Sequence, residues 1–293
     1  MAVAAAFVLA ASAAASPALT IELAPRPTAA GGQIERVDVS LRFTGVEIAA
    51  GEPVLQLPLI ASNVDTVAAT LDRVEVRDAL GVVPLGDSRA DLPVEAARDA
   101  YAGGPSRSWI AARRTRGALT VRYAVPAAAV LPPRGAAPPF AFSNDGGGTS
   151  AAGHVFLLLP PGTRDYRTRL SWNLSALPRG SRAASSWGVG NVAASEPLKP
   201  AQLRAAYFMA GAIGVWQKPA PRGGFFSAWQ GKPPFDAAEL MRWTGTLHGR
   251  YAVFFGQKRP PPYGVFLRFN PINAGGGVGL HHSFVTTFGR AGG

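Results

Sequence analysis

The chain has 293 residues, of which 47% are hydrophobic, contains no cysteine and carries a formal net charge of +11. Its length and hydrophobic content predict a globular protein with one large domain or two ordinary ones. The lack of cysteine excludes disulfides, thiolate metal ligands and a cysteine nucleophile. The basic residues are scattered, and the strongest cluster, Arg113-Arg114-Thr115-Arg116, is short. Because nucleic-acid binding needs basic residues gathered along one face, no nucleic-acid partner is expected.

The chain begins with an apolar segment that is typical of a secretory signal. Residues 1–15 are rich in Ala, Val, Phe and Leu and end in three alanines before Ser16 and Pro17. This pattern matches the apolar region and the A-x-A cleavage site, although no basic residues precede it. Residues 1–17 are therefore expected to be a signal peptide of a periplasmic or secreted protein. A late start codon or an apolar N-terminal strand is the alternative, and no later run is long enough for a transmembrane helix.

Short apolar runs, broken by Gly, Pro, Asn and Asp, continue from residue 18 to about residue 187. In the clearest case Val37, Val39, Leu41 and Phe43 alternate with polar residues, which places one face on a core and the other in water. The expected strands cover residues 19–23, 34–43, 54–59, 71–76, 119–125, 155–159 and 166–174. Seven short strands with turn signals between them predict an antiparallel β-sandwich over residues 18–197.

After the segment that ends at Pro200 the spacing of apolar residues becomes helical, so a smaller α+β part is expected over residues 198–293. A short helix is predicted over residues 201–210. Asp236 and Glu239 form a capping box, which predicts that a long helix starts there and continues to residue 255. Residues 263–269 return to a strand pattern. The predicted fold class is thus mainly β with a smaller α+β part.

The sequence offers few groups for catalysis or metal binding. Its four histidines are His154, His248, His281 and His282, and none belongs to an H-E-x-x-H pair. Adjacent residues of a strand point to opposite faces, so His281 and His282 are not expected to hold one metal together. Asp145, which precedes three glycines, is interpreted as a turn residue rather than a calcium ligand. No catalytic residue and no metal ligand are predicted in this chain.

The order and spacing of several short motifs resemble the N-terminal part of M61-type metallopeptidases, the glycyl aminopeptidase family. The resemblance extends from about Leu19 to Phe288. The motifs that carry it are Pro138-Pro-Phe140, Asp145-Gly-Gly-Gly148, Trp172-Asn-Leu-Ser-Ala-Leu-Pro178, Ser185-Ser-Trp-Gly188, Tyr207-Phe-Met-Ala-Gly211, Phe235-Asp-Ala237 and Asn270-Pro-Ile-Asn-Ala-Gly-Gly-Gly277.

The resemblance implies an N-terminal β-sandwich followed by an incomplete thermolysin-like domain. Family members are periplasmic or secreted enzymes that trim N-terminal residues from peptides with a zinc ion, held by an H-E-x-x-H helix and a downstream glutamate. None of those residues occurs here, so the chain is expected to be truncated before the zinc motif and to be inactive. It is expected to bind no cofactor of its own. Zinc and a peptide substrate are implied only for a complete relative. The family's substrate strand maps to Asn273, Gly275, Gly276, Gly277 and Gly279, where an extended peptide could pair.

Two alternatives stay open at this point. The glycines of residues 275–277 could form only a tight hairpin bend. The chain could also be a non-catalytic exported β-sandwich protein that binds a peptide, a glycan or a partner chain. For residues 198–293, an incomplete sheet is expected to expose Trp243, Phe254, Phe266 and Phe284, and therefore to associate through this apolar surface.

Overall fold

The computed structural model describes residues 17–91, 104–127, 138–217, 224–258, 260, 262–270 and 274–290. The described chain is mainly β, with several sheets and few helices, which confirms the predicted fold class. The predicted signal peptide lies outside the described residues except for Pro17.

The largest sheet contains seven strands. They lie in the spatial order β16 (Val192–Ala193), β13 (Arg167–Trp172), β1 (Ala18–Pro27), β2 (Ile34–Thr44), β10 (Leu119–Pro126), β6 (Val74–Asp78) and β7 (Gly81–Val82). Strand β1 runs antiparallel to β2 and parallel to β13. The side chains of Val37, Val39, Leu41 and Phe43 on β2 are buried, so the predicted alternation is confirmed.

A smaller sheet shares its hydrophobic core with the seven-stranded sheet. Its strands lie in the order β3 (Pro53–Pro58), β9 (Pro105–Ala111) and β8 (Leu85–Asp91), next to a short ribbon of β4 (Ile60–Ala61) and β5 (Val64–Asp65). The 3-10 turn η1 (Val67–Ala69) follows this ribbon. The strand predicted over residues 71–76 starts later, at Val74, because the Leu71 N–H is still bonded to the carbonyl of Val67.

A third sheet is built from both predicted parts of the chain. Its strands lie in the order β11 (Ser143–Asp145), β12 (Gly148–Ala152), β17 (Tyr207–Gly211), β14 (Arg182–Ser185) and β15 (Gly188–Val189). Gly146 and Gly147, with φ angles of 56° and 79°, form the turn predicted after Asp145. Strand β17 follows the boundary predicted at residue 197 yet pairs with β12 and β14, so residues on both sides of that boundary share one sheet.

Two predicted elements near this sheet were wrong. Where a strand was expected over residues 155–159, the structure has the 3-10 turn η3 (Gly153–Val155) followed by a buried segment. Two backbone groups of this segment bond to Tyr123, whose hydroxyl donates to the carbonyl of Phe156 and accepts from the N–H of Leu158. The helix expected over residues 201–210 is only α1 (Pro200–Arg204), because the next apolar run is buried on both faces as β17.

The fourth sheet lies in the order β18 (Ile213–Gln217), β19 (Phe225–Gln230), β20 (Tyr263–Phe269), β22 (Ser283–Phe288) and β21 (Gly277–Leu280). Its central strands are parallel, and its edge strands β18 and β21 run antiparallel to their neighbours. Phe266 on β20 is 0% exposed, and its ring centroid lies 5.1 Å from that of Tyr207 on β17. The prediction that Phe266 is exposed was wrong, because the third sheet covers this face.

Helix α2 (Ala237–Phe254) covers part of the other face of the fourth sheet, over β18 and β19. Asp236 is its N-cap: a carboxylate oxygen of Asp236 accepts the N–H of Glu239 at 2.9 Å, which confirms the predicted start of the helix. On the outer side of the helix, Trp243 and Phe254 are 62% and 80% exposed, as predicted. Among the described residues, no helix has the length and apolar character that a bilayer span requires.

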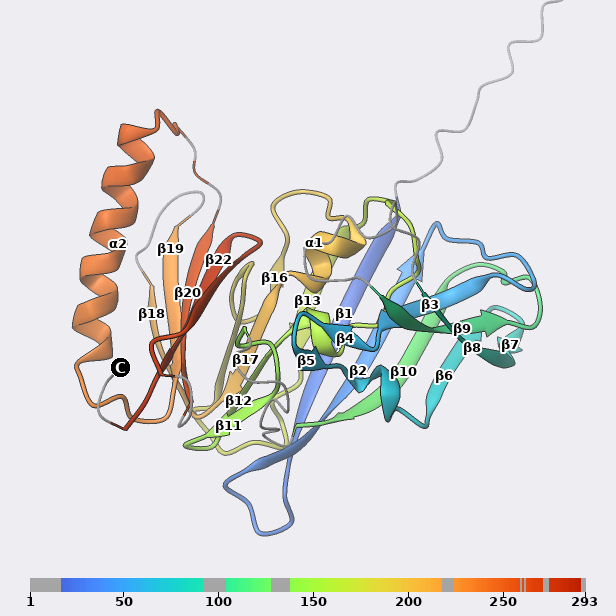
Figure 1. The fold of residues 1–293 in the computed structure, drawn as a ribbon, viewed down its shortest axis with the longest axis horizontal. Helices are drawn as coiled ribbons and strands as arrows, with labels where there is room; N and C mark the ends of the chain where they lie inside the picture. Colours follow the sequence, from blue (N-terminus) through green and yellow to red (C-terminus); the bar gives the residue numbers. More distant parts are fainter. Residues whose placement is uncertain are drawn as a thin grey trace, which may run out of the picture.

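The layers follow one another along the longest axis of the molecule. Figure 1 shows α2 at one end, then the fourth sheet, then β11, β12 and β17 of the third sheet. The long strands β1, β2 and β10 follow, and β3, β8 and β9 lie at the far end. The edge strand β21 therefore belongs to the layer next to α2, whereas β1, β2 and β10 of the seven-stranded sheet lie beyond the third sheet.

Candidate functional site

Strand β21 is the open edge of the fourth sheet. In the described part of the chain its one sheet neighbour is β22, and the pairs run from Gly277 opposite Thr286 to Leu280 opposite Ser283. A bulge precedes the strand, because Thr287 bonds through its N–H to the carbonyl of Gly276 and through its carbonyl to the N–H of Gly275.

The register decides which backbone groups of β21 remain available. In an antiparallel ladder, hydrogen-bonded and non-bonded pairs alternate, and the pair that closes a two-residue hairpin is a bonded one. Leu280 and Val278 therefore bond to β22, whereas the N–H and C=O groups of Gly277 and Gly279 point away from it. These two glycines present donors and acceptors at the spacing that an added strand requires.

The two glycines differ in the space around them. A Cβ on Gly277 would lie 2.6 Å from a ring carbon of Phe284 and 3.1 Å from the carbonyl oxygen of Val285. A Cβ on Gly279 would meet nothing within 4 Å. Phe284 is 38% exposed, so an apolar ring lies beside the open backbone groups. A chain could approach β21 closely here, and its side chains would find an apolar contact.

The structure places the predicted substrate residues as follows. Gly277 and Gly279 lie on β21, Gly276 lies in the bulge, and Gly275 lies in the preceding turn with φ +78°. Asn273 lies outside the described residues. The strand β21 lies at the edge of the fourth sheet, the substrate role of these residues stays a prediction, and the hairpin bend lies at residues 281–282.

His281 and His282 form the two-residue turn that joins β21 to β22. His282 has φ +51°, in the left-handed region, and the two ring centroids are 4.0 Å apart. Both rings reach Glu196, which follows β16: Nε2 of His282 donates to Oε1 of Glu196 at 3.0 Å, and Nε2 of His281 lies 3.5 Å from the same oxygen. The prediction that these histidines point to opposite faces of a strand was wrong, because both residues lie in a turn and both rings face Glu196.

The environment of the turn favours a neutral His281. Burial lowers the pKa of His281 to about 4, and the neighbouring His282 acts in the same direction, whereas the charge of Glu196 opposes the shift. The other two histidines are structural neighbours of aromatic rings. His154 is buried and stacks on Phe140 at 4.7 Å, and His248 stacks on Tyr263 at 5.4 Å.

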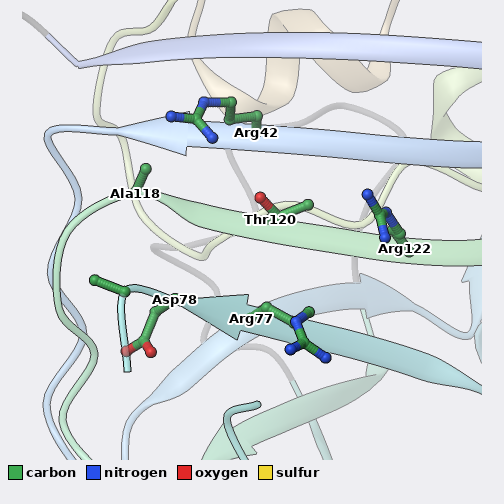
Figure 2. Close-up of a pocket in the computed structure, with 7 residues that line it drawn as sticks. Arg42, Arg77, Asp78, Ala118, Thr120 and Arg122 are labelled. Carbon is green, nitrogen blue, oxygen red and sulfur yellow. The ribbon is translucent and has the colours of Figure 1, made fainter. Parts of the chain in front are cut away.

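A basic surface pocket of about 430 Å³ lies on the seven-stranded sheet, over β2, β6 and β10. Figure 2 shows Arg42, Thr120 and Arg77 side by side on these three strands, and Thr120 is paired in register with both arginines. Arg122 lies two residues further along β10, opposite Glu75, and Arg77 lies 3.9 Å from the same Glu75. The pocket has the charge to attract an anion, but it belongs to a different sheet from β21.

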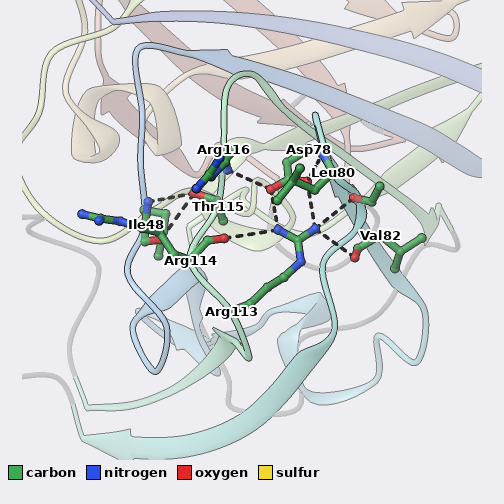
Figure 3. Close-up of polar contacts among 9 residues, drawn as sticks. Ile48, Asp78, Leu80, Val82, Arg113, Arg114, Thr115 and Arg116 are labelled. Atoms are coloured by element: carbon green, nitrogen blue, oxygen red, sulfur yellow. Dashed lines mark hydrogen bonds and ion pairs between the residues drawn. The ribbon is translucent and has the colours of Figure 1, made fainter.

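One arginine of the strongest basic cluster in the sequence forms an ion pair within the fold, whereas Arg114 and Arg116 are exposed. Figure 3 shows Arg113 bound to both carboxylate oxygens of Asp78, at 2.7 and 2.8 Å, with the N–H groups of Arg116 and Leu80 on the same carboxylate. The hydrogen bonds from Arg113 hold the pKa of Asp78 well below its usual range. In the same cluster, the hydroxyl of Thr115 accepts the N–H of Ile48.

Comparison with solved structures finds a shared fold. No family model and no curated protein matches the chain. A crystal structure of an aminopeptidase N family protein from Idiomarina loihiensis matches 93% of this chain with a TM-score of 0.61 and 13% sequence identity. This chain therefore shares the fold of part of that protein. It spans only 42% of the length of that protein.

Two further neighbours have lower TM-scores. A structure of an M1 zinc metallopeptidase from Deinococcus radiodurans matches 93% of this chain and 61% of its own, with a TM-score of 0.45 and 15% identity. A structure of a point mutant of that enzyme, bound to a Tyr-Ser-Ala substrate, matches 93% of this chain and 60% of its own, with a TM-score of 0.46 and 13% identity.

Proposed function

We propose that this chain forms the N-terminal β part and the substrate-pairing sheet of an M61-like zinc aminopeptidase that acts on peptide N-termini in the periplasm or outside the cell. One observation carries the proposal: an open antiparallel edge strand, β21, occurs in a chain that shares the fold of part of an aminopeptidase N family protein. The apolar N-terminal segment supports export.

In this proposal β21 binds the substrate backbone. An extended peptide adds to the sheet, with its own N–H and C=O groups bonded to those of Gly277 and Gly279. A Cβ on Gly279 would meet nothing within 4 Å, so the peptide backbone has room to pair there, and Phe284 supplies an apolar surface for one peptide side chain. Main-chain hydrogen bonds do not depend on the side chains of the peptide, so β21 can bind peptides of many sequences and selects no single residue type.

Hydrolysis by the family's zinc mechanism needs an H-E-x-x-H pair, whose glutamate acts as the general base, and this sequence does not supply one. A catalytic zinc site uses three protein ligands and leaves a position for the attacking water. The sequence has no H-E-x-x-H pair, and His154 and His248 are stacked on aromatic rings of different layers. These residues do not fit the family's zinc site, so we assign no hydrolytic step to them and expect this chain to cleave no aminoacyl amide by itself.

The test uses backbone chemistry at a single position. Gly279→Pro removes the outward N–H without removing a bond to β22, because proline is tolerated at an edge position whose N–H is not in the ladder. Gly279→Ala is the matched variant, since it changes the side chain and keeps the N–H. Binding of a fluorescent peptide with a free N-terminus is measured by anisotropy, and thermal unfolding checks that both variants fold.

We expect Gly279→Pro to weaken peptide binding about 10-fold, because removal of the N–H leaves a peptide carbonyl without its main-chain partner, which costs roughly 1–3 kcal/mol. Gly279→Ala is expected to stay within about 3-fold of the wild type. Equal affinities for the wild type and Gly279→Pro, or no peptide binding at all, would contradict the proposal. Cleavage of the peptide by this chain alone would contradict the expected lack of activity.

A further inference from the structure

We propose that Glu196, His281 and His282 bind one divalent transition metal ion, with Zn²⁺ as the best fit. Within the described chain these residues are a group of metal-ligating side chains whose donor atoms all lie within 4.8 Å of one another. The proposal rests on the side-chain geometry of this chain alone.

The distances between donor atoms suit a tetrahedral ion. Zn²⁺ binds imidazole nitrogen and carboxylate oxygen at about 2.0–2.2 Å, so two ligand atoms of a tetrahedral site lie roughly 3.3 Å apart. Oε1 of Glu196 lies 3.0 Å from Nε2 of His282 and 3.5 Å from Nε2 of His281. Small movements of three side chains would therefore complete the site, and water would take the fourth position.

One of the ligand atoms lacks a hydrogen bond in the described structure. Nε2 of His281 is buried and accepts or donates none among the described residues. A buried polar atom without a partner is costly, and it needs a water, an ion or another explanation. A metal ion between the three side chains would satisfy this nitrogen and would use the oxygen that both rings already face.

The backbone holds the two histidines in place. The N–H of His281 donates to the carbonyl of Ala205 at 3.1 Å, directly after α1, and the carbonyl of His282 accepts the N–H of Gly264 on β20 at 3.0 Å. The next residue, Ser283, shares a 2.7 Å hydrogen bond with Ser186. The turn is thus fixed from three sides, which reduces the entropy that metal binding must overcome.

The carboxylate comes from a segment that is also anchored. Ala194 and Leu198, two residues to either side of Glu196, bond to the backbone of Thr168 and Tyr166 on the β13 side. A groove of about 490 Å³ opens beside Glu196, and the Glu196 side chain is 50% exposed. An ion could therefore enter from solvent. The residue types also fit, since imidazole suits Zn²⁺, Cu²⁺ and Ni²⁺, and the absence of thiolates makes a structural Cys-type site impossible.

The site would join two parts of the fold. Glu196 follows β16 of the seven-stranded sheet, whereas the histidines form the tip of the β21–β22 hairpin in the fourth sheet. A metal ion at this place would cross-link the hairpin to the sandwich and fix the position of the β21 edge. This consequence holds for the fold itself and does not depend on whether β21 binds a peptide.

The experiment measures Zn²⁺ binding to the full chain by isothermal titration calorimetry after removal of metals with a chelator. Two variants remove one ligand each: His282→Asn, because asparagine tolerates the left-handed conformation of this position, and Glu196→Gln. His248→Gln is the matched control, since it removes a histidine of α2 that lies outside the cluster. Circular dichroism and thermal unfolding in the absence of metal verify that all variants fold.

We expect one Zn²⁺ per chain for the wild type and for His248→Gln. Loss of an outer-sphere partner weakens metal sites about 10–100-fold, so loss of a ligand is expected to weaken binding by about 100-fold or more. Zn²⁺ at about 100 times its Kd should raise the Tm of the wild type by about 5 °C and leave His282→Asn unchanged. No saturable binding, or equal affinities for the wild type and the two ligand variants, would overturn the proposal.

Discussion

Replacing Phe266 by alanine tests how the β21 sheet is attached to the rest of the protein. Phe266 lies between the third and fourth sheets with 0% exposure, and its ring is 5.1 Å from Tyr207 and 6.1 Å from Phe226. Because these rings belong to rigid strands, they cannot close the space that the substitution leaves. Phe266→Ala is therefore expected to lower the free energy of unfolding by about 3–5 kcal/mol, the range for a buried phenylalanine with its cavity.

Phe284→Ala is the matched control on the other face of the same sheet. Phe284 is 38% exposed, so about three fifths of its surface is buried. Three fifths of the roughly 1.5–3 kcal/mol for full burial gives about 1–2 kcal/mol, and no closed cavity forms. Both values are measured by urea denaturation, followed by circular dichroism and tryptophan fluorescence. If Phe266→Ala costs no more than Phe284→Ala, the two sheets do not share a packed core, and the account of the fold is wrong.

Three further substitutions test local features. Asp78→Asn removes the partner of Arg113. Because folding lowers the pKa of Asp78, the carboxylate stabilises the fold at neutral pH and this stabilisation is lost on acidification. The deficit of the variant in free energy of unfolding, measured in urea, should therefore shrink as the pH falls to about 3, and a constant deficit would count against the ion pair. Asp236→Ala removes the N-cap of α2 and is expected to cost about 1 kcal/mol by chemical denaturation, whereas no change would mean that the cap is unused. Tyr123→Phe leaves two buried backbone groups without their partner and is expected to lower the free energy of unfolding by about 1–3 kcal/mol; a neutral effect would exclude this role for the hydroxyl.

The sequence predicts the long, regular elements well. The alternation in β2 and the cap at Asp236 are local signals, and the structure confirms both. Errors occur where a local pattern has two solutions. The apolar run around Tyr207 fits one face of a helix as well as a fully buried strand, and only its place between β12 and β14 decides for the strand. The same holds for the exposure of Phe266, which depends on a sheet from a distant part of the chain.

The candidate sites show the same limit. Glycines before a strand suggest a close backbone approach, so the edge at Gly277 and Gly279 could be predicted, although which of their groups point outward required the register with β22. The cluster of Glu196 with His281 and His282 could not be predicted, because 85 residues separate the acid from the first histidine in sequence (281 − 196 = 85). A turn signal was also absent, since His282 takes a left-handed conformation that glycine or asparagine usually occupies.

The most direct test of the central claim is an amide chemical-shift map of the chain during titration with a peptide that has a free N-terminus. The account predicts the largest changes at the outward N–H groups of Gly277 and Gly279, with smaller changes at Phe284. Changes confined to another place, such as the basic pocket at Arg42 and Arg77, would show that the peptide does not pair with β21 and would contradict the account.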